Sequence, residues 1–168
     1  MNRRLFFALW PDNRQRDRLR DVINSVARSV EGRAEDRRNW HITLAFVGEL
    51  AEQRIPELQQ RAAEIRVEPF RLGFDRLEYW PRPKLACLTA PTVPTELQAL
   101  VAAFDSMLLD FGVSPEDRTY RPHITVSRSA RSFTTERLAQ RALTEWSSFE
   151  LIESVTEQRA TSYAPVKQ

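Results

Sequence analysis

The chain's only two histidines lie in matching four-residue strings, and this repetition constrains the fold more than any other feature of the 168 residues. His41 begins the string His-Ile-Thr-Leu, and His123 begins the string His-Ile-Thr-Val about 80 residues later. Self-similarity of this kind indicates an internal duplication. We therefore expect a fold built from two related halves, with one histidine string in each.

Each histidine string has the composition of a short β-strand, since it combines β-branched residues with alternating polar and apolar side chains. Successive side chains of a strand point to opposite faces. His41 and Thr43 are therefore expected on one face, as are His123 and Thr125, while the Ile, Leu and Val residues between them anchor the other face in a core. Two such strands brought together would line one cleft with two imidazoles and two hydroxyls.

The rest of the chain alternates between strand-like and helix-like segments, with Gly48 expected to end the strand of the first string. Strand patterns cover residues 3–10, 40–47, 70–79, 85–89, 123–127, 148–155 and 158–163. Helical periodicity covers residues 19–30, 55–65, 97–111 and 135–143. A helix and a polar loop precede each histidine string, and no linker divides the chain. These patterns predict one α+β domain of two intertwined halves, with mixed or antiparallel sheets facing each other.

Size and composition exclude several classes of protein. A length of 168 residues with 42% hydrophobic content suits one compact domain. No apolar run approaches 18 residues, and the short apolar stretch at residues 5–10 lacks a signal-peptide cleavage site. The single cysteine, Cys87, excludes an internal disulfide and any multi-cysteine metal site. We expect a cytoplasmic protein without a membrane segment and, by default, a monomer.

The basic residues are almost all arginine, with 23 arginines and two lysines. The planar guanidinium suits phosphate oxygens, but a genome rich in arginine codons would give the same bias. The net charge is only +2, which argues against broad electrostatic binding to a polyanion. Arginine content alone therefore decides nothing about the ligand.

Two imidazoles and two hydroxyls in one cleft would suit the hydrolysis of a phosphodiester. Because the ordinary pKa of histidine is about 6.5, one neutral ring can take a proton from water while a protonated ring gives one to the leaving oxygen. Threonine hydroxyls can donate to the non-bridging phosphate oxygens. No Cys, Asp or Glu lies at metal-ligand spacing within either string, so we expect neither a metal ion nor another cofactor.

The paired His-x-Thr-x strings resemble the motif of the 2H phosphoesterase superfamily. The segments at residues 4–9, 40–49 and 120–128 together resemble the bacterial and archaeal RNA 2′,3′-cyclic phosphodiesterases, also called 2′-5′ RNA ligase-like proteins. The likeness follows the order of the chain over nearly its whole length. It implies a bilobal, duplicated α+β fold, in which two mainly antiparallel sheets face a central cleft and helices lie outside. Residues 1–168 would form a single domain of two pseudo-symmetric lobes.

The resemblance also implies an activity and a substrate. The family hydrolyses RNA 2′,3′-cyclic phosphate ends to 2′-phosphomonoesters without a metal, and some members join or cleave 2′-5′ RNA linkages. The partner implied for this chain is RNA with such an end, or a nucleoside 2′,3′-cyclic phosphate. Two alternatives stay open: a 2H phosphoesterase acting on a different small cyclic phosphate, or a non-catalytic module that binds RNA ends.

The family motif assigns roles to six residues of this sequence. His41 and His123 would be catalytic, with His123 handling the water and His41 the departing 3′ oxygen, although the sequence leaves the substrate orientation open. Thr43, Thr125 and Arg128 would bind phosphate, and Phe7 would stack on a base. Strict alternation places Arg128 on the face opposite His123, so a bulge or a strand end must turn it inward.

Overall fold

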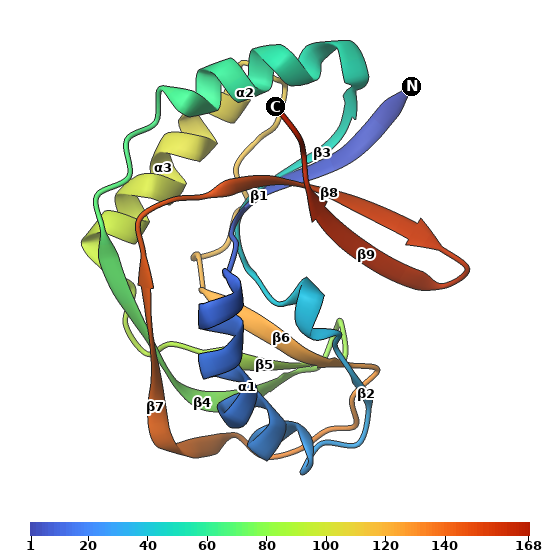
Figure 1. Cartoon of the computed structure of the whole chain (residues 1–168), viewed down its shortest axis with the longest axis vertical. Coiled ribbons are helices and arrows are strands. Elements are labelled where there is room, and N and C mark those ends of the chain that lie inside the picture. The colour runs from blue at the N-terminus through green and yellow to red at the C-terminus, as the bar shows by residue number, and fades with distance from the viewer.

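The computed structural model describes residues 1–168 and contains two antiparallel β-sheets, which occupy the upper and lower parts of Figure 1. The upper sheet has the strand order β3 (Ile42–Ala51), β1 (Asn2–Leu9), β8 (Glu150–Glu157) and β9 (Ala160–Pro165). The lower sheet has the order β2 (Arg33–Ala34), β6 (His123–Arg128), β5 (Leu85–Thr89), β4 (Phe70–Trp80) and β7 (Glu136–Trp146). All strand pairs are antiparallel, which confirms the expected α+β class.

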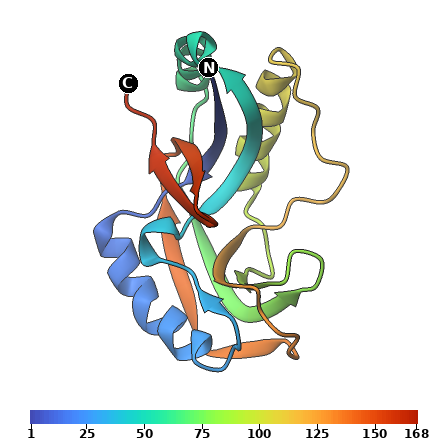
Figure 2. The same cartoon turned by 90° about the vertical axis from the view of Figure 1, so that its right-hand side faces the viewer.

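Two of the three α-helices cross from one sheet to the other. Helix α1 (Asn13–Ala27) follows β1 of the four-stranded sheet but packs against β6 and β7 of the five-stranded sheet. Helix α3 (Thr95–Leu109) connects β5 and β6 of the five-stranded sheet but packs against β3 and α2 (Ile55–Ala63). Figure 2 shows α1 and α3 on opposite sides of the molecule. Each sheet is therefore covered by a helix that follows a strand of the other sheet.

Local sequence signals mark the start of α1 and both ends of α3. Asp12 is the N-cap of α1, and its carboxylate accepts a hydrogen bond from the Gln15 backbone N–H at 2.7 Å while the Gln15 side chain caps the Asp12 N–H at 2.8 Å. Helix α3 starts directly after Pro94, and Gly112, with a φ of 76°, follows its end. No helix is both long enough and apolar enough to cross a membrane.

One hydrophobic core connects the two sheets. A single cluster of 34 buried residues includes side chains from β1, β3, β4, β5 and β6 and from all three α-helices. At its centre the Phe7 and Phe104 rings stack at a centroid distance of 4.4 Å. Because this core is continuous, it fixes the strands of the two histidine strings relative to each other.

Two local expectations are wrong. Residues 135–143 do not form a helix: they belong largely to β7, which pairs with β4 and buries Ala142, Thr144 and Trp146 in strand alternation. Pairing with a neighbouring strand outweighs the helix propensity of this segment. Gly48 does not end β3 either, because it lies inside the strand with a φ of 81°. It adjoins a β-bulge at Val47, after which pairing with β1 continues to Ala51.

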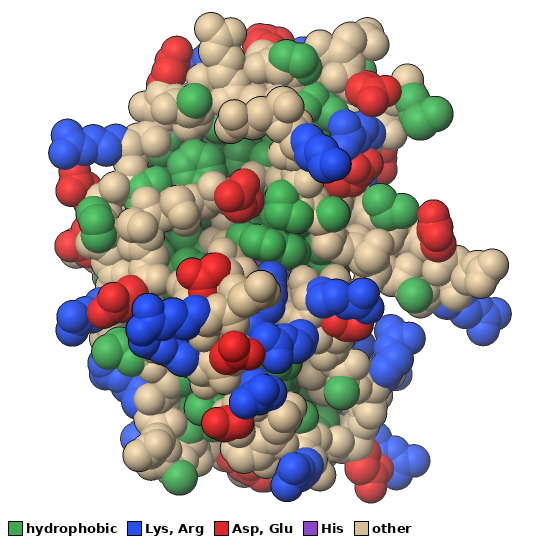
Figure 3. All heavy atoms as spheres, viewed as in Figure 1, with side chains coloured by type: hydrophobic (Ala, Val, Ile, Leu, Met, Phe, Trp, Pro, Cys, Tyr) green, Lys and Arg blue, Asp and Glu red, His purple; other side chains and the backbone are tan.

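Basic side chains are unevenly distributed over the surface. On the face drawn in Figure 3, Lys and Arg lie mainly over the lower half, with Asp and Glu among them. This half holds α1 and the five-stranded sheet. Arg14, Arg18 and Arg20 are exposed on α1, and Arg37 pairs with Asp17 at 2.8 Å. Part of the arginine content therefore serves as the solvated face of a helix.

Candidate active site

The two histidine strings lie on different sheets but share one cavity. His41 directly precedes β3, and His123 is the first residue of β6. A cavity of about 610 Å³ is lined by residues of both strings, Thr43 from the first and His123 from the second. The cavity extends along β3 and α3 to the loop at residues 113–121. The topology thus brings together two strings that are far apart in the sequence.

The alternation predicted for both strings is confirmed. Ile42 and Leu44 are buried, as are Ile124 and Val126. His41, Thr43, His123 and Thr125 are all partly exposed. Each string therefore anchors its apolar side chains in the core and presents its imidazole and hydroxyl on the opposite face.

Both imidazoles are oriented by the same backbone contact. The Nδ1–H of His41 donates to the carbonyl of Asn39 at 2.6 Å, and the Nδ1–H of His123 donates to the carbonyl of Arg121 at 2.9 Å. In each case the acceptor lies two residues before the histidine. A carbonyl can only accept, so this contact holds the proton on Nδ1 and leaves Nε2 as the nitrogen that exchanges a proton with a ligand.

His41 lies in an aromatic enclosure. Its ring centroid is 5.0 Å from that of Phe6, 5.0 Å from that of Tyr163 and 6.1 Å from that of Trp10. Its Nε2 is 3.1 Å from the Thr43 hydroxyl oxygen. Burial lowers the pKa of His41 to about 4; the hydrogen bond to Asn39 opposes this shift, and the positive charges of His123 and Arg128 add to it.

His123 lies beside a single aromatic ring and has a free nitrogen. The Trp80 ring is 4.2 Å away between centroids, and the Arg121 guanidinium lies over the same Trp80 ring at 5.2 Å. Nε2 of His123 makes no hydrogen bond within the protein. Burial lowers the pKa of His123, the contact with the Arg121 carbonyl opposes this, and the charge of Arg121 lowers the pKa further. Both rings are therefore mainly neutral near pH 7 in the unliganded cleft, and a bound anion would favour protonation.

Arg128 reaches the site because β6 contains the bulge that its position requires. Thr125 pairs with Cys87 and Ser127 pairs with Ala86, so Val126 is the extra residue. Arg128 donates from Nε to Glu35 and from Nη2 to the Tyr163 hydroxyl at 3.0 Å. Tyr163 in turn packs edge-on against the His41 ring. The bulge thus directs Arg128 to the side of the cleft where His41 lies.

The expectation for Phe7 is wrong. Its side chain is 1% exposed and packs on Phe104 in the core, so it has no free face for a base. Phe6, the preceding residue on β1, contacts His41 and Tyr163 instead. Strand alternation separates these two phenylalanines, but the run of apolar residues in β1 does not reveal which of them belongs to the core.

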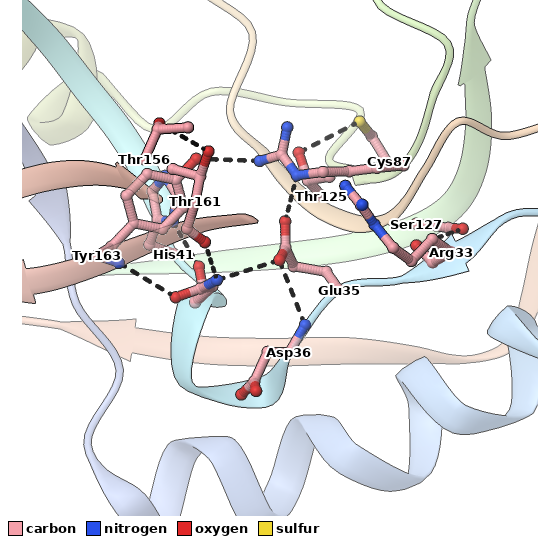
Figure 4. Close-up of polar contacts among 12 residues, drawn as sticks. Arg33, Glu35, Asp36, His41, Cys87, Thr125, Ser127, Thr156, Thr161 and Tyr163 are labelled. Atoms are coloured by element: carbon pink, nitrogen blue, oxygen red, sulfur yellow. Dashed lines mark hydrogen bonds and ion pairs between the residues drawn. The ribbon is translucent and has the colours of Figure 1, made fainter. Parts of the chain in front are cut away.

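Sequence reasoning missed three polar residues of the site, Glu35, Asn39 and Tyr163. In Figure 4, Glu35 lies to the right of His41 and Tyr163 and below Thr125. Tyr120 donates its hydroxyl to the Thr43 carbonyl at 2.8 Å and so links the two strings. Glu35 and Asn39 belong to a polar loop and Tyr163 to the last strand. Nothing in the local pattern distinguishes them from surface residues.

Cys87 has the properties of a buried structural thiol. It is fully buried, and burial raises its pKa to about 12. Its Sγ lies 3.9 Å from the Thr125 hydroxyl oxygen. A thiol with this pKa is protonated at neutral pH and is a poor nucleophile. The structure contains no group of three or more His, Cys, Asp or Glu side chains arranged to hold a metal ion.

Comparison with known proteins identifies the family. The model for LigT-like phosphoesterases matches residues 9–86. The RNA 2′,3′-cyclic phosphodiesterase of Escherichia coli K12 is 30% identical over 132 residues, which cover 79% of this chain and 75% of that protein. The chain belongs to the LigT-like family of 2H phosphoesterases. The RNA 2′,3′-cyclic phosphodiesterase of Aeropyrum pernix is 33% identical over 114 residues, which cover 66% of this chain and 64% of that protein.

Solved structures show the LigT-like fold over the full chain. The crystal structure of E. coli LigT complexed with 3′-AMP superposes with a TM-score of 0.87 at 28% identity. The match covers 99% of this chain and 97% of the E. coli chain. The two antiparallel sheets and three helices are therefore those of a LigT-like phosphoesterase.

Proposed function

We propose that this chain hydrolyses RNA 2′,3′-cyclic phosphate ends to 2′-phosphomonoesters without a metal ion. The observation that carries the proposal is the pair of imidazoles, each anchored at Nδ1 by a carbonyl two residues earlier, with Thr43 of one string and His123 of the other lining the same cavity. The names of the relatives support this choice of substrate, since those proteins are described as RNA 2′,3′-cyclic phosphodiesterases.

The reaction needs one proton taken and one proton given. Water attacks phosphorus and passes a proton to one Nε2, while the P–O3′ bond breaks and O3′ takes a proton from the other Nε2. The product carries a 2′-phosphate and a 3′-hydroxyl. The Thr43 and Thr125 hydroxyls donate to the non-bridging oxygens, where negative charge is concentrated, and Arg128 adds a positive charge.

We propose that His123 accepts the proton of the attacking water and that His41 donates a proton to the leaving oxygen. His123 lines the cavity and its Nε2 has no partner in the protein, so this nitrogen is free to accept a proton from a water molecule. Enclosure of His41 makes its imidazolium a stronger acid than that of an ordinary histidine, because burial lowers its pKa. A bound anionic phosphate would raise the pKa of His41 and so favour the protonated ring that a general acid requires.

The experiment is to incubate the purified protein with a nucleoside 2′,3′-cyclic phosphate in the presence of EDTA. We expect only the 2′-phosphomonoester, which ³¹P NMR distinguishes from the 3′ isomer. His41→Ala and His123→Ala should each reduce turnover strongly. Absence of turnover by the unmodified protein, or turnover by either variant equal to that of the unmodified protein, would contradict the proposal.

A different small cyclic phosphate or a 2′-5′ linked oligonucleotide is the second candidate substrate. The cavity, at about 610 Å³, has the size of a small-molecule site and is lined by Phe46, Trp80 and Tyr120. Rates on a mononucleotide, a dinucleotide and a longer RNA with the same cyclic end would separate these substrates. If a double histidine variant still bound RNA ends tightly and the unmodified protein formed no product, the chain would instead be a binding module.

We further propose that the chain is one domain of two pseudo-symmetric lobes and that it acts as a monomer. The repeated string, its repeated Nδ1 contact and the reciprocal crossing of α1 and α3 support the duplication. Sedimentation analysis at several concentrations tests the oligomeric state.

A further inference from the structure

A buried carboxylate that the proposed mechanism does not use connects both halves of the site. The Glu35 side chain is 9% exposed and lies in the loop between β2 and β3. We propose that Glu35 is a positioning residue, which holds Arg128 in the orientation that meets the substrate phosphate and ties this arginine to the backbone that orients His41. This inference rests on the proposed function, in which Arg128 contacts phosphate.

Glu35 is itself fixed by the five-stranded sheet. Its backbone N–H donates to the Val126 carbonyl at 2.9 Å, directly at the bulge of β6. From this position one carboxylate oxygen accepts from Nε of Arg128, and the other accepts from the Asn39 side-chain amide at 3.2 Å. The carboxylate therefore reaches two different elements of the site at once (Figure 4).

The contacts of Arg128 leave part of its guanidinium available. Nε donates to Glu35 and Nη2 donates once to the Tyr163 hydroxyl. A guanidinium has five N–H donors, so three remain without an acceptor in the protein. Because the Nε edge is held by a carboxylate, the free donors at the tip have a fixed direction, as two-point recognition of phosphate requires.

Asn39 carries the connection to His41. Its backbone carbonyl accepts from Nδ1 of His41. Its side chain donates to the Thr161 carbonyl at 3.1 Å and accepts from the Tyr163 N–H at 3.3 Å, both on β9 of the four-stranded sheet. The loop from Glu35 to His41 is thus bonded to both sheets, to the five-stranded sheet through Glu35 and to the four-stranded sheet through Asn39. The hydrogen bond between the Glu35 and Asn39 side chains connects these two points.

Charge explains why a carboxylate occupies this position. The titratable and charged groups that act on His41 are His123 and Arg128 on β6 and Glu35 in the loop, and Tyr163 on β9 packs against its ring. Glu35 is the only acid among them. A partly buried arginine without a counter-charge is costly and would move toward other acceptors. Replacement of Glu35 by Gln keeps the side-chain shape but removes the charge that holds the Nε edge.

A double-mutant cycle tests the inference. If Glu35 acts through Arg128, E35Q should lower kcat/KM for a nucleoside 2′,3′-cyclic phosphate by up to about 100-fold, with most of the loss in kcat. In an R128A background the same change should have little further effect. E35D should recover part of the activity. The matched control is E153Q, which removes a carboxylate paired with Arg3 on the other sheet and should leave kcat/KM unchanged.

Thermal unfolding must first show that each variant is folded. Activity of E35Q within threefold of the unmodified protein, or an equal loss in both backgrounds, would overturn the inference. If the unmodified protein does not turn over the substrate, the proposed function fails, and titration with inorganic phosphate still decides the role of Glu35. The NMR signals of the two histidine rings report phosphate affinity: a change caused by E35Q only when Arg128 is present supports the inference. An equal change, or no change, in both backgrounds rejects it.

Discussion

His41 and His123 share the same local structure but have different surroundings. Each ring donates from Nδ1 to the carbonyl two residues earlier, and each begins a string that buries the alternate apolar side chains. Three aromatic rings enclose His41, and its Nε2 lies beside the Thr43 hydroxyl. His123 has one aromatic neighbour, and its Nε2 is free. A duplicated motif can therefore supply two chemical groups of one type, while the packing around each group adapts it to a different role.

Removal of either imidazole has the largest expected effect, and a modified substrate distinguishes the roles of the two rings. H41A and H123A should each lower kcat by about 10²- to 10⁴-fold, because each removes a group that we propose as general acid or base. A substrate with sulfur in place of the leaving 3′ oxygen needs no acid, since a thiolate is a stable leaving group. We expect this substrate to restore turnover in H41A but not in H123A, measured by release of the thiol. Rescue of H123A alone would reverse the assignment of the two roles.

Removal of the two hydroxyls tests whether the halves contribute equally to charge stabilisation. T43V and T125V should each reduce kcat by about 10²- to 10³-fold, as for loss of one donor to a developing negative charge. T43V should also shift the titration of His41, because it removes the hydroxyl 3.1 Å from Nε2, whereas T125V should not. T156V, which alters an exposed hydroxyl contact on β8, is the control. Unchanged kcat in both site variants would show that the threonines serve only the strands.

The neighbouring residues Phe6 and Phe7 have different surroundings: Phe6 contacts His41 at the site, and Phe7 belongs to the core. F7A should lower the free energy of unfolding by about 3–5 kcal/mol, because it empties a fully buried site stacked on Phe104. Activity per folded molecule should stay near normal. F6L should instead raise the pKa of His41 through weaker enclosure. Urea unfolding and kinetics on the same samples check both expectations, and a normal stability for F7A would contradict the described core.

The titrations of the two rings give the smallest expected effect. NMR of the unliganded protein should show two histidine signals that both titrate below the usual pKa of about 6.5, with that of His41 near pH 4. Between these values the unfolded chain binds protons that the folded chain does not. Stability should therefore rise with pH across this window and become independent of His41 above it. When the pH is lowered from 7 to 5, the urea concentration at the unfolding midpoint should decrease less in H41A than in the unmodified protein. An equal slope would contradict a lowered pKa.

Local sequence patterns were sufficient for most of the elements. The histidine strings and the apolar spacing of α3 depend on neighbours within a few residues, and the structure confirms them. The predictions of a helix at 135–143 and of a strand end at Gly48 were wrong, because both features depend on pairing with distant strands. Phe7 was wrong for a related reason, since alternation separates two faces but does not say which one meets the cleft.

The sequence by itself determined that two imidazoles would each share a strand face with a hydroxyl, because backbone geometry makes side chains alternate. The same alternation means that Arg128 could join them only through a bulge or a strand end. Only the tertiary structure decided that Arg128 meets Glu35, 93 positions away, and that Asn39 meets Tyr163, 124 positions away. It also decided that aromatic rings enclose one histidine more than the other. These contacts depend on how two sheets pack, and local propensities carry no information on contacts over such separations.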